Sequence, residues 1–278
     1  MKKYGFLFLI FVVATPLFSQ SYWMGNRLTN SSIYLDPTEI QVSGSMTSLL
    51  KKNALENQYI PFSFGIAQAI YSKKIEEHKA WDIIGELGSF TQFEWKKVEG
   101  IQQRNLINID YKIAFSFVKQ LNETSTYRIR FFHVSSHLGD DYIIRNQIIS
   151  YTKNKVNYEQ LDLSYFKRFS PYHLAYGGIG SVVRPNSIRL PLSFYLGWQK
   201  EFKKENSNWA WSLGANLKSF QETDFNLNTK LAAGIAYYTA SKQEPIRIVL
   251  EHYRGHLPYS QFERTRTEWL GIGLYFYI

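Results

Sequence analysis

Two side chains able to do chemistry stand close together in the segment 131–142, where His133 and Ser135 lie two residues apart. On a β-strand such residues point to the same side, with their Cα atoms roughly 6.5–7 Å apart. A histidine at that distance can take the proton of a serine hydroxyl and so make its oxygen a nucleophile. Toward the N-terminus the same side continues as an apolar stripe of Tyr127, Ile129 and Phe131. The pair therefore indicates attack on an ester bond in apolar surroundings.

A third group must orient the histidine of such a pair. In the next predicted strand, Glu159 alternates onto the same side as His133 and Ser135, which makes it the candidate carboxylate. Other polar groups in this region stand as alternates for the three roles: Ser136, His137 and Asp110.

A metal site is a second chemistry that this segment permits. His133 and His137 are about 13 Å apart along a strand, too far to bind one ion unless the strand bends at Ser136. Asp140 and Asp141 follow directly and, with loop carbonyl groups, could form a calcium site. Calcium is therefore the only cofactor that this pattern suggests, and no cofactor is required by it.

The elements that must position these groups are β-strands. From about residue 59 onward, segments of roughly ten residues alternate between apolar and polar or small side chains, with short polar turns between them. Within residues 225–238, for example, Leu227 and Leu231 lie on one side while Asn228 and Lys230 lie on the other. This pattern is typical of strands that face lipid on one side and a polar lumen on the other.

These segments predict an all-β fold, a closed antiparallel transmembrane β-barrel of about 12 strands, within a range of roughly 10 to 14. A soluble β-sandwich would alternate in the same way and is the alternative. The first segment is poorly patterned and is also compatible with a plug or an arm. The segments lie near residues 40–50, 59–73, 81–97, 104–118, 126–138, 157–169, 172–184, 190–202, 209–219, 225–240, 245–254 and 265–278.

The composition fits a barrel. The chain has 20 Tyr, 20 Phe and 7 Trp, so that 17% of its residues are aromatic, yet its mean hydropathy is slightly negative. Aromatic girdles around a polar interior produce this mixture. The sequence has no Cys, which rules out disulfides and thiolate chemistry.

The N-terminal residues predict export. Residues 1–19 combine Lys2 and Lys3 with an apolar run and small residues, which is typical of a secretory signal peptide. Residues 20–39 then form a polar lead and residues 40–278 the barrel. We therefore expect a location in the outer membrane of a Gram-negative bacterium, with insertion by the barrel-assembly machinery.

The formal net charge of +9 bears on the partners. The chain has no basic cluster and no nucleic-acid motif, so nucleic acid is not an expected partner. Membrane lipids or lipopolysaccharide, which carry phosphate groups, are the expected ones. The oligomeric state is open between a monomer and a weak dimer.

The orientation of the barrel decides where the candidate site lies. If both termini are periplasmic, the strand near 126–138 ends at the outer surface, and His133 and Ser135 face lipid near the outer leaflet. Arg128, Arg130 and Asp110 then point into the lumen. The connections outside the cell would be 51–58, 98–103, 139–156, 185–189, 220–224 and 255–264.

Several motifs resemble a bacterial envelope family named domain of unknown function 1207. The most specific of them is Ser135-Ser136-His137-Leu138-Gly139-Asp140. The supporting ones are Leu35-Asp36-Pro37, Ile109-Asp110-Tyr111, Tyr176-Gly177-Gly178, and Tyr253-Arg254-Gly255 with Pro258, Gln261 and Phe262. This resemblance implies a location in the cell envelope and brings no activity with it.

A shorter resemblance points to an activity. The run from His133 to Ser136 is similar to the His-x-Ser-Asn element of two families of lipid hydrolases, outer-membrane phospholipase A and lipid A deacylase, although Ser136 stands where those families have Asn. In both families the His and the Ser hydrolyse acyl esters on the outside wall of a barrel, oriented by an Asn or a Glu. The resemblance implies that His133 is the base, Ser135 the nucleophile and Glu159 the orienting group.

Two interpretations without catalysis remain open. Residues 135–141 could form only a strand end and a turn, in which Asp140 bonds local backbone and Gly139 has a positive φ. The inward charges, such as Arg128, Arg130 and Lys112, could instead bind or pass a small anionic solute, although barrels of this size are commonly filled by side chains.

Overall fold

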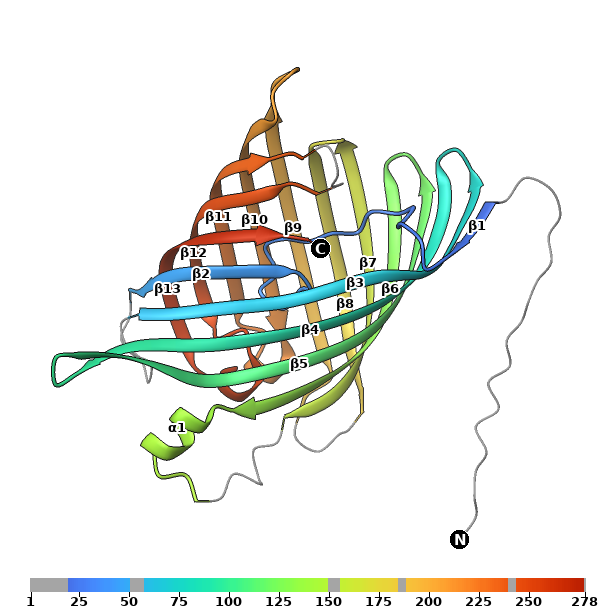
Figure 1. Ribbon diagram of the computed structural model, residues 1–278. Helices are drawn as coiled ribbons and strands as arrows, with labels where there is room; N and C mark the ends of the chain where they lie inside the picture. The colour runs from blue at the N-terminus through green and yellow to red at the C-terminus, as the bar shows by residue number, and fades with distance from the viewer. Residues whose placement is uncertain (1–19, 51–57, 150–155, 185–188, 240–243, 278) are drawn as a thin grey trace, which may run out of the picture.

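The computed structural model describes residues 20–50, 58–149, 156–184, 189–239 and 244–277. Strands β2 to β13 form one antiparallel sheet that closes on itself, since β2 pairs with both β13 and β3, and β3 pairs with β4 (Figure 1). The predicted barrel of 12 strands is thereby confirmed. None of the helices within these ranges is long and apolar enough to cross a membrane.

Each of the twelve sequence segments overlaps one strand of the barrel. The longest strands are β3, β4 and β5, with 19, 20 and 22 residues, and the β4–β5 hairpin extends beyond its neighbours in Figure 1. The barrel strands are β2 (Val42–Leu49), β3 (Gln58–Glu76), β4 (Lys79–Val98), β5 (Ile101–Asn122), β6 (Ser125–Leu138), β7 (Asn157–Ser170), β8 (His173–Arg184), β9 (Leu192–Lys203), β10 (Trp209–Phe220), β11 (Leu227–Tyr237), β12 (Ile246–His256) and β13 (Arg266–Phe276). A short strand β1 (Gln20–Trp23) precedes them, and α1 (Asp140–Arg145), η2 (Gln221–Thr223) and η3 (Ser260–Phe262) lie in connections.

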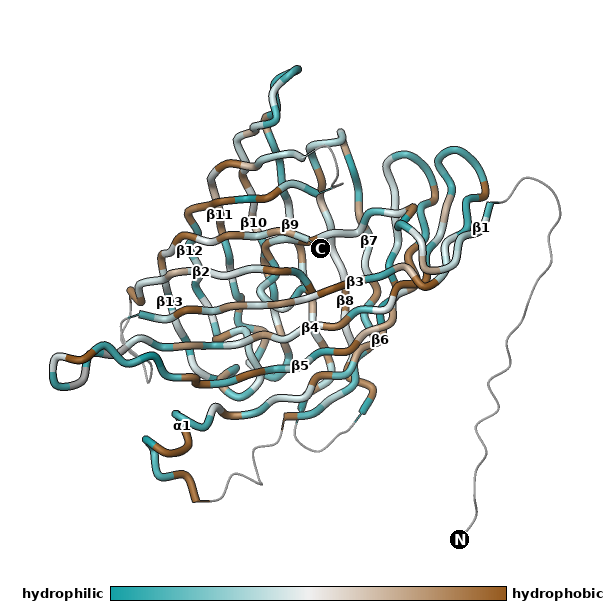
Figure 2. The backbone as a smooth tube through the Cα atoms, in the orientation of Figure 1, coloured by the Kyte–Doolittle hydropathy of each residue, from teal (hydrophilic) through white to brown (hydrophobic). Residues whose placement is uncertain are grey.

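The period-two pattern of the sequence sorts side chains between the two faces of the sheet. In β11, Leu227 and Leu231 are 55% and 46% exposed on the outer wall, whereas Asn228 and Lys230 are buried inside. Hydrophobic and hydrophilic positions accordingly alternate along the strands in Figure 2. An apolar outer wall around a polar interior is the arrangement that a surrounding bilayer requires.

The two ends of the barrel differ. One end, which we call the α1 end, carries α1, η2 and η3. At the opposite end, which we call the β1 end, β1 pairs with the C-terminal part of β3, from Trp23 opposite Tyr71 to Gln20 opposite Lys74.

Residues 24–41, which we call the plug, run through the interior of the barrel between β1 and β2 (Figure 1). Three consecutive plug residues are at most 1% exposed: Ile33, Tyr34 and Leu35. Ile33 packs with residues of β7, β8 and β9, whereas Tyr34 and Leu35 pack with residues of β11, β12 and β13. The predicted polar lead therefore contains an apolar anchor, and the first barrel strand begins at Val42.

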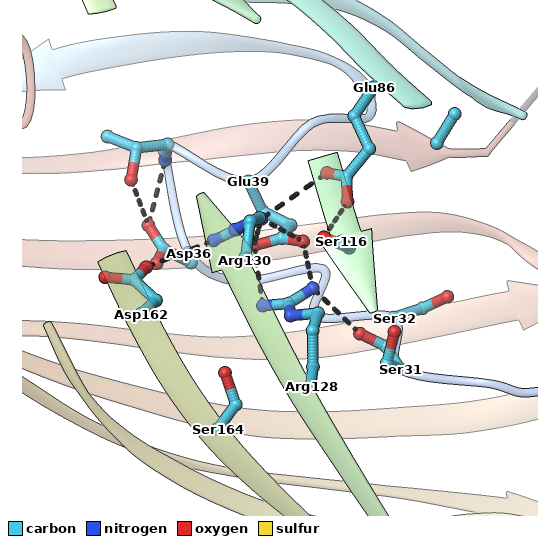
Figure 3. A network of polar contacts seen from close by, with 12 residues as sticks. Ser31, Ser32, Asp36, Glu39, Glu86, Ser116, Arg128, Arg130, Asp162 and Ser164 are labelled. Carbon is cyan, nitrogen blue, oxygen red and sulfur yellow. Dashed lines mark hydrogen bonds and ion pairs between the residues drawn. The ribbon is translucent and has the colours of Figure 1, made fainter. Parts of the chain in front are cut away.

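Ion pairs attach the plug to the inner wall (Figure 3). Glu39 accepts hydrogen bonds from Arg128 at 2.7 Å and from Arg130 at 3.0 Å. Burial alone would raise the pKa of the Glu39 carboxyl, but the charges of Arg128 and Arg130 outweigh it and lower this pKa to about 2. Asp36 pairs with Lys218 at 2.8 Å, and this pair likewise outweighs burial and holds the pKa of Asp36 below its usual range. Three of the inward charges, Arg128, Arg130 and Lys218, thus bind the plug.

A second segment closes the α1 end. In the β12–β13 loop, residues 257–265, the side chains of Leu257, Tyr259 and Phe262 are buried. They belong to an interior apolar cluster with Trp269, whose ring stacks on Tyr253 with centroids 4.0 Å apart. Between this loop and the plug a cavity of about 40 Å³ remains, far smaller than a channel.

Candidate active site

Strand β6 keeps the predicted alternation over its whole length. Its pairing with β7 runs without a register shift from Ser125 opposite Lys167 to Ser135 opposite Asn157. Since no bulge interrupts β6, His133 and Ser135 both lie on the outer wall near the α1 end, as the spacing predicted. Their inward neighbours Val134 and Ser136 are buried.

His133 and Glu159 form a hydrogen-bonded pair across two strands. The two residues face each other in the register of β6 and β7, and His133 Nδ1 lies 2.9 Å from Glu159 Oε1. Their side chains are 41% and 28% exposed, so both reach the outer surface. The structure therefore brings together the predicted base and the predicted orienting carboxylate.

Ser135 is bonded to a different histidine from the one predicted. Its Oγ lies 3.0 Å from Nε2 of His137, two residues further along the same wall. Within the described part of the chain, no hydrogen bond joins Ser135 to His133. The rings of Tyr111 and His137 lie at a steep angle to each other, with centroids 6.0 Å apart. Two hydrogen-bonded pairs thus lie next to each other on the outer wall, Ser135 with His137 and His133 with Glu159.

The alternates Ser136 and Asp110 lie on the other side of the wall. Ser136 donates a hydrogen bond to Asp110 inside the barrel, and Asp110 also accepts bonds from the backbone N–H of Ser260 at 2.9 Å and from its hydroxyl at 3.0 Å. These groups hold the β12–β13 loop against β5 and β6. They are separated from the outer wall by the sheet itself, whereas the alternate His137 is exposed on that wall.

The end of the motif is structural in a way that the sequence did not predict. Gly139 has a φ of −71°, so the expected positive φ is wrong. Glycine is required there for another reason, because a Cβ at this position would lie 2.2 Å from the carbonyl oxygen of Leu106. The expected turn is instead the start of α1. It is Asp141, rather than Asp140, that bonds backbone, by accepting the N–H of Leu106 at 2.9 Å.

The described residues around Asp140 and Asp141 do not form a set of calcium ligands. Asp140 and Asp141 occupy the first turn of α1, and the carboxylate of Asp141 is engaged by β5. Among the residues that the structure describes, no group of three His, Asp or Glu side chains is placed to hold a metal ion. The calcium site therefore rests on the sequence pattern alone.

Known structures share this fold. The outer membrane phospholipase A of Escherichia coli, in an active-site mutant, superposes with a TM-score of 0.57 at 10% identity, covering 91% of this chain and 94% of that one. A second structure of the Escherichia coli protein gives a TM-score of 0.56 at 10% identity, covering 85% and 89%. The outer membrane phospholipase dimer of Salmonella typhi with bound calcium gives 0.55 at 8% identity, covering 86% and 93%.

At these identities the likeness establishes the fold alone, which is that of Gram-negative outer-membrane barrels. No curated protein matches the sequence. A family model does match residues 24–278, which is nearly the whole of the described chain. The chain accordingly belongs to the family described as protein of unknown function DUF1207.

Proposed function

We propose that this protein is an outer-membrane enzyme that hydrolyses acyl esters of outer-leaflet lipids, with Ser135 as nucleophile, His133 as base and Glu159 as the group that orients His133. The observation that carries the proposal is the hydrogen bond between His133 Nδ1 and Glu159 Oε1, 2.9 Å long, on the outer wall of the barrel. In hydrolases of the serine type, the carboxylate bonds this nitrogen and leaves Nε2 for the nucleophile.

The tautomer of His133 follows from this bond. A neutral imidazole that donates its Nδ1–H to a carboxylate has its lone pair on Nε2. That nitrogen can accept the proton of Ser135 as Oγ attacks the carbonyl carbon of the ester. The same proton then passes to the departing alcohol as the acyl group remains on Ser135. Water, deprotonated by His133, releases the fatty acid and restores the serine.

Ser135 must turn from His137 toward His133 before it can react in this way. The residues are on one face of one strand, so the change needs rotation of side chains and no movement of backbone. Hydrogen bonds of catalytic groups are often misaligned until substrate binds. In this proposal His137 holds the hydroxyl in the resting enzyme. His137 has no carboxylate partner within the described ranges, which favours His133 as the base.

The surroundings of the pair indicate the substrate. The outward apolar side chains nearest to His133 along and across the strands are Ile113, Phe131 and Leu161, which are 46–50% exposed. Such a wall is covered by acyl chains in a bilayer, with the pair at the end of the strand where lipid head groups begin. A lipid ester is therefore the substrate that reaches Ser135 by lateral diffusion. An outward-facing α1 end places this wall in the outer leaflet.

The test is release of fatty acid from labelled phospholipid and lipid A by the purified barrel in detergent micelles. Ser135→Ala should reduce the rate by roughly 10³-fold. The matched control is Ser136→Ala, because this serine is the next residue on the same strand and points into the lumen. Equal rates for Ser135→Ala and the unmodified protein, or no release by either, would refute the proposal.

A further inference from the structure

An apolar groove lies on the outer wall on the side of the barrel away from His133. It has a volume of about 330 Å³ and spans β12, β13, β2, β3 and β4 toward the α1 end. This volume is on the order of ten water molecules, so the groove has room for one extended segment of an acyl chain. Its walls include Met46, Leu50, Ile60, Trp95, Leu250 and Ile272.

An irregularity between two strands explains why the wall is hollowed at this place. The pairing of β2 with β3 is interrupted between Gly44 opposite Phe62 and Thr47 opposite Tyr59. Pro61 lies within this gap and has no N–H to donate to the ladder. The groove is therefore part of the folded wall.

Polar groups stand above the groove, nearer to the rim of the α1 end. His252 Nε2 lies 3.2 Å from Glu268 Oε1 on the outer wall, and His252 is opposite the groove residue Leu270 in the register of β12 and β13. Two residues further along β12, Arg254 points outward as well and is exposed. This second pair of histidine and glutamate was not predicted from the sequence.

Among the residues that the structure describes, none provides a counter-ion for Arg254. It is opposite Glu268 in the strand register, but that carboxylate bonds His252. No acidic side chain in the described ranges forms an ion pair with Arg254. Its neighbour Tyr253 stacks on Trp269 inside the barrel, which fixes the parity of the strand and keeps Arg254 on the outside. The Tyr253-Arg254-Gly255 motif thus presents an unpaired cation at the level of lipid head groups.

We propose that this groove is a binding site for one anionic glycerophospholipid, with an acyl chain in the groove and the phosphate on Arg254. Along β12 the distance from Leu250 to Arg254 is about 13 Å, which matches a head group above the first part of a chain. Guanidinium groups bind phosphate through charge-assisted hydrogen bonds. One groove and one unpaired cation suit a lipid with one phosphate better than lipid A with several chains and two phosphates.

Binding can be measured separately from hydrolysis. The protein carries Ser135→Ala, so that no lipid is consumed, and native mass spectrometry from detergent micelles records retention of added phosphatidylglycerol or phosphatidylcholine. We expect phosphatidylglycerol to be retained preferentially, and Arg254→Ala to weaken its binding about tenfold. Lys119→Ala, which removes an exposed cation of the outer wall near the β1 end, should leave the binding unchanged. The result does not depend on whether the unmodified protein is an esterase.

A second pair of variants tests the groove itself. Ile272→Asn places an amide in the groove, and Leu196→Asn makes the same change elsewhere on the outer wall. The two side chains are 62% and 61% exposed, so both substitutions should impose a similar cost on insertion into the bilayer. Only Ile272→Asn should weaken lipid retention. Equal retention of the two phospholipids, binding that is insensitive to Arg254→Ala, or stronger Arg254-dependent retention of lipid A would overturn the proposal.

Discussion

The attachment of the plug should dominate the stability of the barrel interior, and Glu39→Gln tests it. Glu39 accepts four hydrogen bonds, two each from Arg128 and Arg130. Arg130 keeps Glu86 and Asp162 as neighbours at 3.6 Å when Glu39 loses its charge. Among the residues that the structure describes, Arg128 keeps the carbonyl of Ser31 as its one hydrogen-bond acceptor. Because a buried charge is then left uncompensated, we expect a loss of roughly 3–5 kcal/mol of unfolding free energy.

The pH dependence gives an independent value for the same interaction. The folded pKa of Glu39, about 2, is lower than in the unfolded chain, so its contribution is complete above about pH 5 and is lost as the pH falls toward 2. The shift corresponds to on the order of 3 kcal/mol. Acidification and Glu39→Gln should therefore remove the same contribution, because both take away the charge of Glu39.

Urea unfolding of the barrel in phospholipid vesicles at pH 7 and pH 3 measures both quantities. Glu39→Gln should be less stable at pH 7 and should lose less on acidification than the unmodified protein, because one titrating group is gone while Asp36 remains. Glu39→Leu combined with Arg128→Met should recover part of the loss, since it removes both buried charges. A Glu39→Gln protein within about 0.5 kcal/mol of the unmodified one at pH 7 would refute the reasoning.

Three further outcomes follow from the site and the lumen. Glu159→Gln should lower kcat by roughly 10²–10⁴-fold with little change in KM, because the amide no longer stabilises a protonated His133; kinetics with a soluble ester would show whether kcat falls at all. Gly139→Ala should destabilise the barrel by about 1–3 kcal/mol, since the new Cβ would meet the Leu106 carbonyl; an unchanged urea midpoint would contradict this close approach. The unmodified protein should pass no steady current in planar bilayers, because the plug and the β12–β13 loop occupy the lumen; stable single-channel steps would contradict a filled interior.

The sequence predicts the outer wall well because period-two alternation is a local property. Leu227 and Leu231 face outward and Lys230 inward whatever their distant partners are. The same local rule places His133, Ser135 and Glu159 on one face, since the pairing of β6 with β7 has no register shift between these positions. Most of what the sequence predicts correctly about the candidate site therefore follows from the alternation of side chains along the strands.

The interior could not be predicted because its contacts join residues far apart in sequence. Glu39 meets Arg128 across 89 positions, and nothing in the composition of residues 20–39 identifies them as a segment that fills the barrel. The choice of Ser135 between two histidines depends on side-chain rotation, which strand parity does not fix. The need for glycine at position 139 could not be predicted correctly either. It comes from the close approach of the Leu106 carbonyl, which exists only once β5 and β6 are paired.

The most direct test of the central claim is the identity of the residue that becomes acylated or phosphonylated. The purified barrel is treated with a lipid-tailed fluorophosphonate, which reacts with activated serine hydroxyls, and the modified peptide is sequenced by mass spectrometry. We expect the adduct on Ser135 and its loss in Glu159→Gln, where His133 is no longer held by a carboxylate. No adduct on Ser135, or an adduct that persists unchanged in Glu159→Gln, would contradict hydrolysis by Ser135, His133 and Glu159.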